Sequence, residues 1–515
     1  MRKQSLLQGA FVLTAAGFVT KILGFATTIL QSRLLGAEAI GLQMMVTPYI
    51  GLLMTITTLG MPVAVSKAVA EADAAGDRQK IRRVLLVSLA VTLATAAVLA
   101  LAMLYFAKPF AAKFLADQRA YYSLMALAPM IPILAVSGIV RGYFQGLQHM
   151  NPLAVSQVVE QVFRIFLLYA LVQMLAPRGL EYAAAGAVIA GVAGELAGLL
   201  YLIFCFRIST VLQMARRSYL RSLPQSKIDL LELLRTGIPQ TGNQFFRALL
   251  RAVQPTLISR SLLAAGFDAP AIAEQYGMLT GYVFPLLFFP GFVNYSLAVA
   301  LVPAISEAGS KHRFKLVNRR VSQAIRVSLL IGIPSSLILF VFAEPILDFF
   351  YRAPEAAGLL RLTAPFYLFQ YFHSPLQSSL IGLGRSTTAM INNVIPRCIS
   401  LALIYPLAVN LNLGIAGVAI ASSVAVILET ILQYLALYRC TGPCLRFSDV
   451  AKMAGCGIPA ALFAYVTYDT LHLYRVGDGA AALGGIAALL FMYFSLIFLT
   501  KTVRWSSVLV TLRQR

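Results

Sequence analysis

The chain has 515 residues, of which 59% are hydrophobic and only 12% are charged. Soluble domains carry about 25% charged residues, so this composition excludes an ordinary soluble globular protein. The net charge of +22 would favour nucleic-acid binding in a soluble protein. Here, however, apolar runs long enough to cross a bilayer recur along the whole chain. We therefore expect an all-α polytopic membrane protein that contacts the lipid bilayer and no nucleic acid.

Apolar windows of about 20 residues predict the transmembrane helices. Fourteen are expected, centred near residues 18, 50, 95, 133, 165, 193, 245, 288, 332, 370, 398, 425, 461 and 490. The first is expected to be a retained span, because it contains Lys21 and lacks the small-residue cleavage site of a signal peptide. Of the 42 basic residues, 25 lie in the two tails and the even-numbered loops, nine in the odd-numbered loops and eight inside spans. This asymmetry places both termini in the cytoplasm.

Short internal echoes indicate two related halves, a common organisation in transporters. They pair Ser32-Arg33-Leu34 with Ser259-Arg260-Ser261 (offset 227), Arg82-Arg83 with Arg319-Arg320 (offset 237) and Gly146-Leu147 with Gly382-Leu383 (offset 236). We expect an N-terminal lobe of six helices over residues 1–206 and a basic cytoplasmic linker over 207–227. A C-terminal lobe of six helices over 228–446 and two additional helices with a basic tail over 447–515 complete the expected organisation.

Charged residues inside the predicted spans are the main functional signal. Eight are cations: Lys21, Arg141, Arg164, Arg235, Arg247, Arg251, Arg326 and Arg397. Four are acids: Glu160, Glu195, Glu429 and Asp469. A cation facing lipid costs about 3 kcal/mol, and eight together would exceed the roughly 5–15 kcal/mol of net stability that proteins have. Most of the cations must therefore face water or a partner, and the acids are too few to pair with all of them.

The seventh span carries a continuous polar face. Gln240, Gln244, Arg247, Arg251 and Gln254 follow one another at intervals of four, three, four and three residues, the spacing of one helix face. One interpretation is a helix that lines the interface between halves and is held by hydrogen bonds. The other is the wall of a cavity for an anion, since guanidinium binds phosphate through a planar fork.

Three other places carry polar groups at membrane depth. In the fifth span, Gln157 precedes Glu160 and Arg164, and the last two are four residues apart, so we predict that they pair. By the offset of 236, Asn392, Asn393 and Arg397 occupy the equivalent stretch of the second half. Lys21 lies too deep in the first span for easy access to either surface, which favours a cavity cation. Arg235 and Arg326 lie nearer cytoplasmic ends, where the side chain can reach water.

Several motifs resemble those of the multidrug/oligosaccharidyl-lipid/polysaccharide (MOP) exporter superfamily, in particular its sporulation polysaccharide-biosynthesis branch, a relative of the MurJ-type lipid II flippases. The motifs are Lys21-Ile22-Leu23-Gly24-Phe25, Arg33-Leu34-Leu35-Gly36, Gly60-Met61-Pro62, Arg141-Gly142-Tyr143-Phe144-Gln145-Gly146 and Met150-Asn151-Pro152. The resemblance covers essentially the whole chain. It implies two six-helix lobes around a cationic cavity and two extra helices that form a groove for a lipid tail. Thr27 stands where MurJ-type proteins usually carry a second arginine of the first-helix motif.

The resemblance implies a flippase, not an enzyme, in the bacterial cytoplasmic membrane. Its cargo would be an undecaprenyl-diphosphate-linked sugar, a peptidoglycan precursor for the spore cortex, moved to the outer leaflet by alternating access. Peptidoglycan-synthesis proteins are possible partners, and neither cofactor nor metal is expected. The candidate substrate-binding cations are Lys21, Arg247, Arg251, Arg141 and Arg164, and the candidate cavity-shaping residues are Glu160, Gln157, Gln244, Asn393 and Arg397. Three alternatives stay open at this point: a cation-coupled multidrug exporter of the same superfamily, a membrane glycosyltransferase or acyltransferase, and a passive scaffold.

Overall fold

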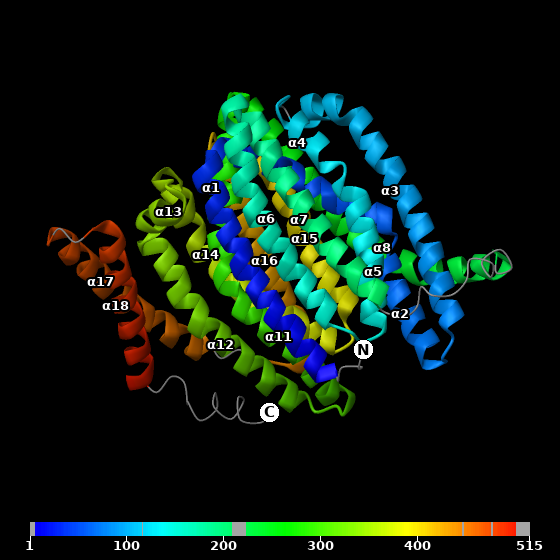
Figure 1. The fold of residues 1–515 in the computed structure, drawn as a ribbon. Coiled ribbons are helices and arrows are strands. Elements are labelled where there is room, and N and C mark those ends of the chain that lie inside the picture. Colours follow the sequence, from blue (N-terminus) through cyan, green and yellow to red (C-terminus); the bar gives the residue numbers. More distant parts are fainter. Residues whose placement is uncertain (1–5, 116, 209–222, 445–446, 475–476, 501–515) are drawn as a thin grey trace. The chain divides into compact units, whose positions relative to one another are not determined.

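The computed structural model describes residues 6–115, 117–208, 223–444, 447–474 and 477–500, and within these ranges it contains helices and no strands (Figure 1). The predicted all-α fold is confirmed. The chain divides into two compact units, Met1–Gly277 and Met278–Arg515. Most of the predicted basic linker (residues 209–222) and the basic tail (501–515) lie outside the described residues.

The first unit is built from long helices. They are α1 (Leu6–Thr58), α2 (Met61–Ala74), α3 (Arg78–Phe114), α4 (Ala120–Leu127), α5 (Met130–Gly146), α6 (Asn151–Leu175), the 3₁₀ turn η1 (Ala176–Arg178), α7 (Leu180–Ile208), α8 (Leu223–Ala264) and α9 (Ala269–Gly277). Helix α1 is interrupted at Gly36, whose φ of 75° and ψ of 174° lie outside the helical region. The first two predicted spans are therefore the two parts of α1, joined where glycine permits a sharp change of direction.

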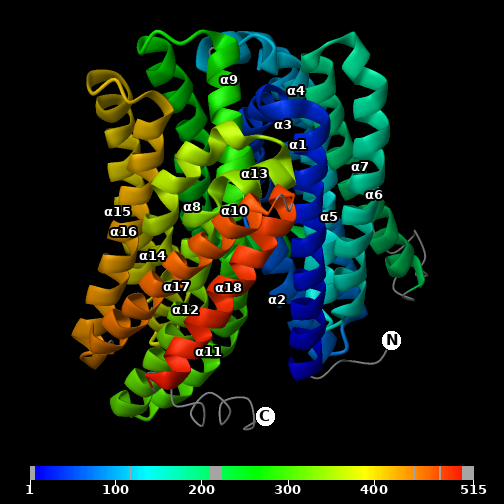
Figure 2. The same cartoon turned by 90° about the vertical axis from the view of Figure 1, so that its left-hand side faces the viewer.

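The second unit begins with an interrupted helical stretch. It contains the π-helix η5 (Met278–Val283), α10 (Phe284–Phe288), the 3₁₀ turn η6 (Phe289–Gly291), α11 (Phe292–Ser310), α12 (Phe314–Val341), α13 (Ala343–Tyr351), η7 (Pro354–Ala356), α14 (Ala357–Gly382), α15 (Ser386–Tyr405), the π-helix η8 (Pro406–Asn410), α16 (Gly414–Thr441), α17 (Phe447–Leu473) and α18 (Asp478–Leu499). Helices α17 and α18 lie side by side at the end of the chain (Figure 2).

All fourteen predicted span centres lie in helical segments. Within the described residues, ten helices are long and apolar enough to cross a membrane, and the first of them, Val12–Thr58, covers two predicted spans. The spans predicted near residues 245, 288 and 370 do not reach that threshold. The segment near 288 falls short because the helix is interrupted between η5 and η6. The segment near 245 falls short because α8 carries a polar face. A multi-pass membrane protein is confirmed, and the count of fourteen is approximate.

Contacts within the two units recur at the offset predicted for the repeat. A methyl group added at Gly146 on α5 would lie 2.6 Å from the carbonyl oxygen of Ser66 on α2. A methyl group added at Gly382 on α14 would lie 2.8 Å from the carbonyl oxygen of Val302 on α11. The offset is 236 residues for the glycines and for the carbonyl groups. The pairs α2–α5 and α11–α14, α6–α7 and α15–α16, and α5–α7 and α14–α16 are accordingly in contact in their own units.

We expect Gly146→Ala and Gly382→Ala to destabilise the protein by similar amounts, about 1–3 kcal/mol each, because both add a methyl group where helix backbones touch. Gly191→Ala is the matched control, since nothing lies within 4 Å of the added carbon at this position of α7. Thermal unfolding of the three purified variants measures the effect. Equal midpoints for Gly146→Ala and Gly191→Ala would contradict the close packing.

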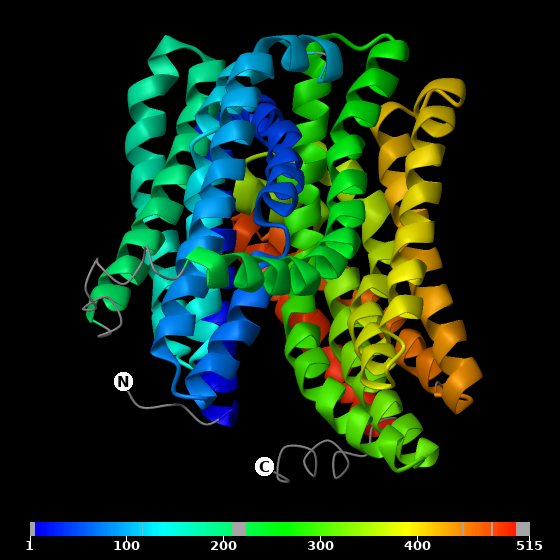
Figure 3. The ribbon, with the colours of Figure 1, turned by 90° about the vertical axis from the view of Figure 1, so that its right-hand side faces the viewer.

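Helix α8, which contains the seventh predicted span, packs in the first unit against α1, α2 and α3. The backbones of Gly237 and Gly60 approach so closely that a Cβ at Gly237 would lie 2.4 Å from the carbonyl oxygen of Leu59. Further along, the hydroxyl groups of Tyr49 and Thr256 form a 2.7 Å hydrogen bond. Figure 3 shows that the green ribbon of α8 changes direction along its length. The division between compact units thus follows α9, whereas the lobe limits drawn from the sequence remain a prediction.

Candidate functional site

The predicted polar face of α8 is exposed in its middle part and half-buried at Gln254. Gln244, Arg247 and Arg251 are exposed, while Ala248 and Ala252, one position further round the helix, are buried. Small residues therefore form the packed face of α8, and the arginines lie beside it. Arg247 follows Gly237 by ten residues, about 15 Å along a helix, so it lies well inside the span. Within the described residues, no carboxylate lies within ion-pair distance of Arg247. The side chain of Gln240 is outside the described ones.

Lys21 is a second exposed cation of the first unit. It lies on the first part of α1, among the exposed side chains of Phe18 and Ile22. No described carboxylate pairs with its ammonium group, and Glu38, later in α1, is bound by Arg119 at 2.7 Å. The predicted cavity cations Lys21, Arg247 and Arg251 thus occur together in one compact unit, on α1 and α8.

Two ion pairs fix the first part of α8 to the start of α3. Arg83 Nε lies 3.0 Å from Asp229 Oδ2, with both side chains largely buried, and Lys80 Nζ lies 3.4 Å from Glu232 Oε2. Further along α8, Gly237 packs on Gly60. Contacts on both sides of this glycine therefore set the direction of the helix. These contacts position the arginine-bearing part of the helix.

Arg141 and Arg164 lie in a network with two acids on α5, α6 and α7. Arg164 Nη2 is 2.6 Å from Glu160 Oε1, which confirms the pair predicted from their spacing. Arg141 Nη2 is 2.9 Å from Glu195 Oε1 and 3.5 Å from Glu160 Oε2. Ser137 donates a 2.9 Å hydrogen bond to Glu195 Oε1. Two arginines and two buried glutamates leave this network without net charge.

The pairing limits what Arg141 and Arg164 can do for an anion. Both guanidinium groups already bind carboxylates, and the Nε atom of each is buried without a hydrogen-bond partner in the described part of the chain. Gln157 is half-buried one turn before Glu160. The structure thus gives this group a role in holding α5, α6 and α7 together, and its part in substrate binding stays a prediction.

In the second unit, Asn393 belongs to a polar cluster that joins α14, α15 and α16. Asn393 on α15 contacts His373 Nε2 at 3.1 Å and Gln433 Nε2 at 2.7 Å. His373 Nε2 also lies 3.0 Å from Glu429 Oε1. Arg397, one turn further along α15, is exposed. Sequence spacing indicated Asn393 and Arg397 as polar groups at membrane depth but did not connect them with Glu429. The offset of 236, which aligns His373 with Ser137, was the available signal.

Comparison with known proteins identifies the family. The family described as "Polysaccharide biosynthesis protein" matches residues 6–309, more than half of the chain. The chain belongs to the polysaccharide biosynthesis protein family. The family described as "MatE" matches residues 280–405, in the second unit. The predicted resemblance to the MOP superfamily is thereby confirmed.

Relatives of this polysaccharide biosynthesis protein include two from Bacillus subtilis. Stage V sporulation protein B is 39% identical over 502 residues, which cover 96% of this chain and 97% of that protein. Lipid II flippase MurJ is 28% identical over 421 residues, which cover 78% of this chain and 77% of that protein. Among solved structures, the inward closed conformation of lipid II flippase MurJ has a TM-score of 0.68 at 16% identity, with 96% of this chain and 100% of that chain covered. The fold is thus that of a flippase and transporter superfamily.

Proposed function

We propose that the protein is a flippase that moves an undecaprenyl-diphosphate-linked sugar, a peptidoglycan precursor for the spore cortex, from the inner to the outer leaflet. The observation that carries the proposal is the pair of exposed intramembrane cations Lys21 and Arg247, neither of which has a carboxylate partner in the described residues. The names of the relatives, a sporulation protein and a lipid II flippase, agree with this cargo.

A diphosphate fits the proposed site because it carries about two negative charges and several acceptor oxygens. Arginine binds such a group through two parallel N–H donors, and lysine adds a point charge. In our proposal Lys21, Arg247 and Arg251 bind the head group, and Gln244 adds a neutral donor beside them on α8. Arg141, Arg164, Glu160 and Gln157 hold the helices of the first half, and Asn393 and Arg397 supply polar groups in the second half.

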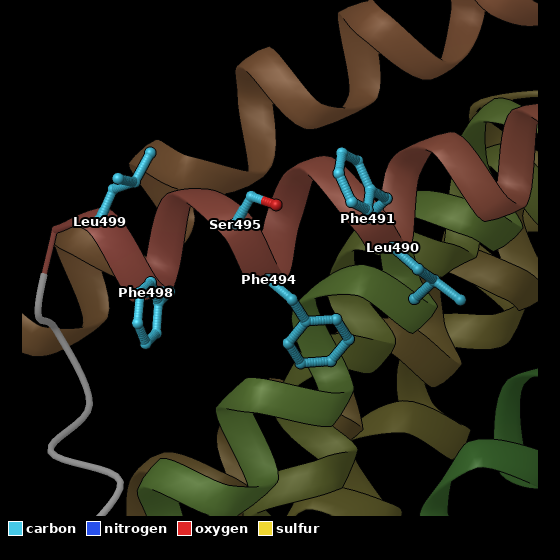
Figure 4. Close-up of a pocket in the computed structure, with 6 residues that line it drawn as sticks. All are labelled: Leu490, Phe491, Phe494, Ser495, Phe498 and Leu499. Atoms are coloured by element: carbon cyan, nitrogen blue, oxygen red, sulfur yellow. The ribbon is translucent and has the colours of Figure 1, made fainter.

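The last helix offers a place for the lipid tail. A groove of about 700 Å³ on α18 is lined by Leu490, Phe491, Phe494, Ser495, Phe498 and Leu499 (Figure 4). Five of these six side chains are apolar, so the groove is suited to a prenyl chain and not to the charged head group. In the proposed function the prenyl tail of the cargo occupies this groove.

The membrane potential provides a driving force in this proposal. With both termini in the cytoplasm, as the distribution of basic residues favours, export moves the diphosphate down an inside-negative potential. Each charge that crosses gains about 2.3 kcal/mol per 100 mV. Peptidoglycan-synthesis proteins are the partners that such a cargo requires on either side of the membrane.

Reconstitution tests the proposed function directly. The full-length protein is inserted into liposomes that contain a fluorescent lipid-linked sugar diphosphate, and dithionite quenches the label in the outer leaflet only. We expect transfer of the label between leaflets to depend on the protein. A fluorescent organic cation, encapsulated in parallel liposomes, tests the multidrug-exporter alternative. Transport of the cation without transfer of the lipid-linked sugar would overturn the proposal.

A further inference from the structure

The internal repeat allows the polar clusters of the two halves to be compared residue by residue. At an offset of 236, Ser137 corresponds to His373 and Arg141 to Gln377, and Gln157 corresponds to Asn393. Glu195 is the sixteenth residue of α7, and Glu429 is the sixteenth residue of α16. The contact that defines the cluster is retained, because Ser137 Oγ is 2.9 Å from Glu195 Oε1 and His373 Nε2 is 3.0 Å from Glu429 Oε1.

The two clusters differ in how the glutamate is neutralised. In the first half, Arg141 provides a permanent positive charge 2.9 Å from Glu195. In the second half, Gln377 stands at the corresponding position and is neutral. The partner of Glu429 is instead His373, whose charge depends on a proton. Both side chains are buried. A buried carboxylate without a counter-charge is unfavourable by several kcal/mol, so the pair favours retention of one proton.

Neutral side chains surround this pair. With its amide nitrogen turned toward Glu429, Asn393 donates to Glu429 Oε1 at 2.9 Å and accepts from Gln377 Nε2 at 2.7 Å. In the opposite orientation of this amide, Asn393 Oδ1 accepts from Gln433 Nε2 at 2.7 Å instead. In both orientations Gln433 Nε2 donates to the carbonyl oxygen of Ala389 at 3.0 Å. The cluster therefore links α14, α15 and α16 through groups that can donate or accept as the proton count changes.

Other titratable groups near the pair come from α14 and α15. Arg397 on α15 is the further cation whose field acts on His373, and Tyr367 on α14 lies within electrostatic reach of Glu429 and Arg397. Helix α12, which also packs against α14, carries Arg326 in its apolar part. When the proton leaves, the pair changes from net zero to one negative charge, and Arg397 is the cation placed to balance it.

We propose that His373 and Glu429 form a proton-binding site of the second half, which takes up one proton from water and returns it, where the first half keeps a permanent ion-pair network. With the proton bound, imidazolium and carboxylate attract each other across α14 and α16. Without it, a neutral imidazole faces the carboxylate, and the link between the two helices weakens. The packing of the second half is thereby sensitive to the protonation of one histidine.

Nitrogen NMR of the full-length protein in lipid nanodiscs tests the site without any substrate. The chain has four histidines, and His373→Gln identifies the signal of His373 by its loss. We expect this signal to change reversibly between protonated and neutral imidazole within about pH 5–8. In Glu429→Gln we expect a neutral imidazole throughout, because a buried imidazolium would lack its counter-charge. A wild-type His373 that keeps one protonation state from pH 5 to 9 would overturn the proposal.

Two further variants keep the test decisive if Glu429→Gln does not fold. Gln377→Arg gives the second half the permanent cation of the first, and we expect it to abolish the pH response of His373. His472→Gln is the matched control, since His472 and Asp478 form an exposed pair at the same 3.0 Å separation, and its removal leaves the response of His373 unchanged. An unaltered response in Gln377→Arg would contradict the inference.

Sodium ions are the competing occupant of such a cluster. Titrations in sodium and in choline buffers separate the two, because a proton site gives the same protonation curve in both. If the His373 signal changes with sodium while the protonation of His373 stays constant, the cluster binds the metal ion and not a proton. That result would overturn the proposal. Since the readout requires no lipid-linked sugar, its outcome is independent of the proposed flippase function.

Discussion

Arg247→Ala and Arg251→Ala are each expected to slow transfer of the lipid-linked sugar by about 10- to 150-fold. The reason is that a hydrogen bond to a charged group contributes about 1.5–3 kcal/mol, and each 1.36 kcal/mol changes a rate tenfold. Arg247→Lys keeps the charge and loses the planar fork, so its rate is expected to lie between those of the parent and the alanine variant. The liposome assay with dithionite measures all of these rates.

Arg235→Ala is the matched control for these variants. Arg235 is an exposed arginine of the same helix, twelve residues before Arg247, so its loss changes the net charge equally without removing a proposed ligand. We expect it to transport at the parent rate. If correctly folded Arg247→Ala and Arg251→Ala proteins also transport at that rate, the diphosphate is bound elsewhere.

Arg141→Ala is expected to lower the free energy of unfolding by about 3–5 kcal/mol. The substitution leaves Glu195, which is 3% exposed, as a buried carboxylate without its cation, and loss of one partner of a buried pair has this cost. Denaturant titration of the purified protein measures the effect. The double variant Arg141→Met, Glu195→Leu removes both charges and is expected to recover much of the lost stability, because apolar side chains can replace a buried pair.

The exposed pair of Lys67 and Glu71, 3.8 Å apart on α2, is the control for that experiment. Lys67→Ala is expected to cost less than about 1 kcal/mol, since water screens a surface ion pair. If Arg141→Ala is no more destabilising than Lys67→Ala, then Glu195 is neutralised by something other than this arginine, and the network does not hold the first half together.

The sequence predicted what local spacing determines. Apolar length placed all fourteen predicted span centres in helical segments, and the i,i+4 spacing of Glu160 and Arg164 predicted their contact. The pair of Arg141 and Glu195 joins residues 54 positions apart, and no periodicity connects two such groups on different helices. Their pairing depends on the close packing of α5, α6 and α7, where Gly194 lets the α7 backbone approach the carbonyl of Glu160.

The limits of the compact units could not be predicted for a related reason. Residues 207–227 look like a boundary because they are basic and polar, yet α8 packs on helices that precede it in the chain. The small residues Gly237, Ala248 and Ala252 on its packed face signalled a close contact. Their partners, Gly60 among them, lie in a different part of the sequence, so the contact is a property of the fold.

The apolar groove on α18 has a practical consequence for work with the purified protein. Phe491, Phe498 and Leu499 are each at least two-thirds exposed, so the alkyl chain of a detergent can occupy the same surface as a prenyl tail. Each buried methylene contributes about 0.8 kcal/mol, which makes long-chain detergents competitors at millimolar concentration. Affinities measured in micelles will therefore underestimate the contribution of the tail, and truncated substrate analogues are best compared in bilayers.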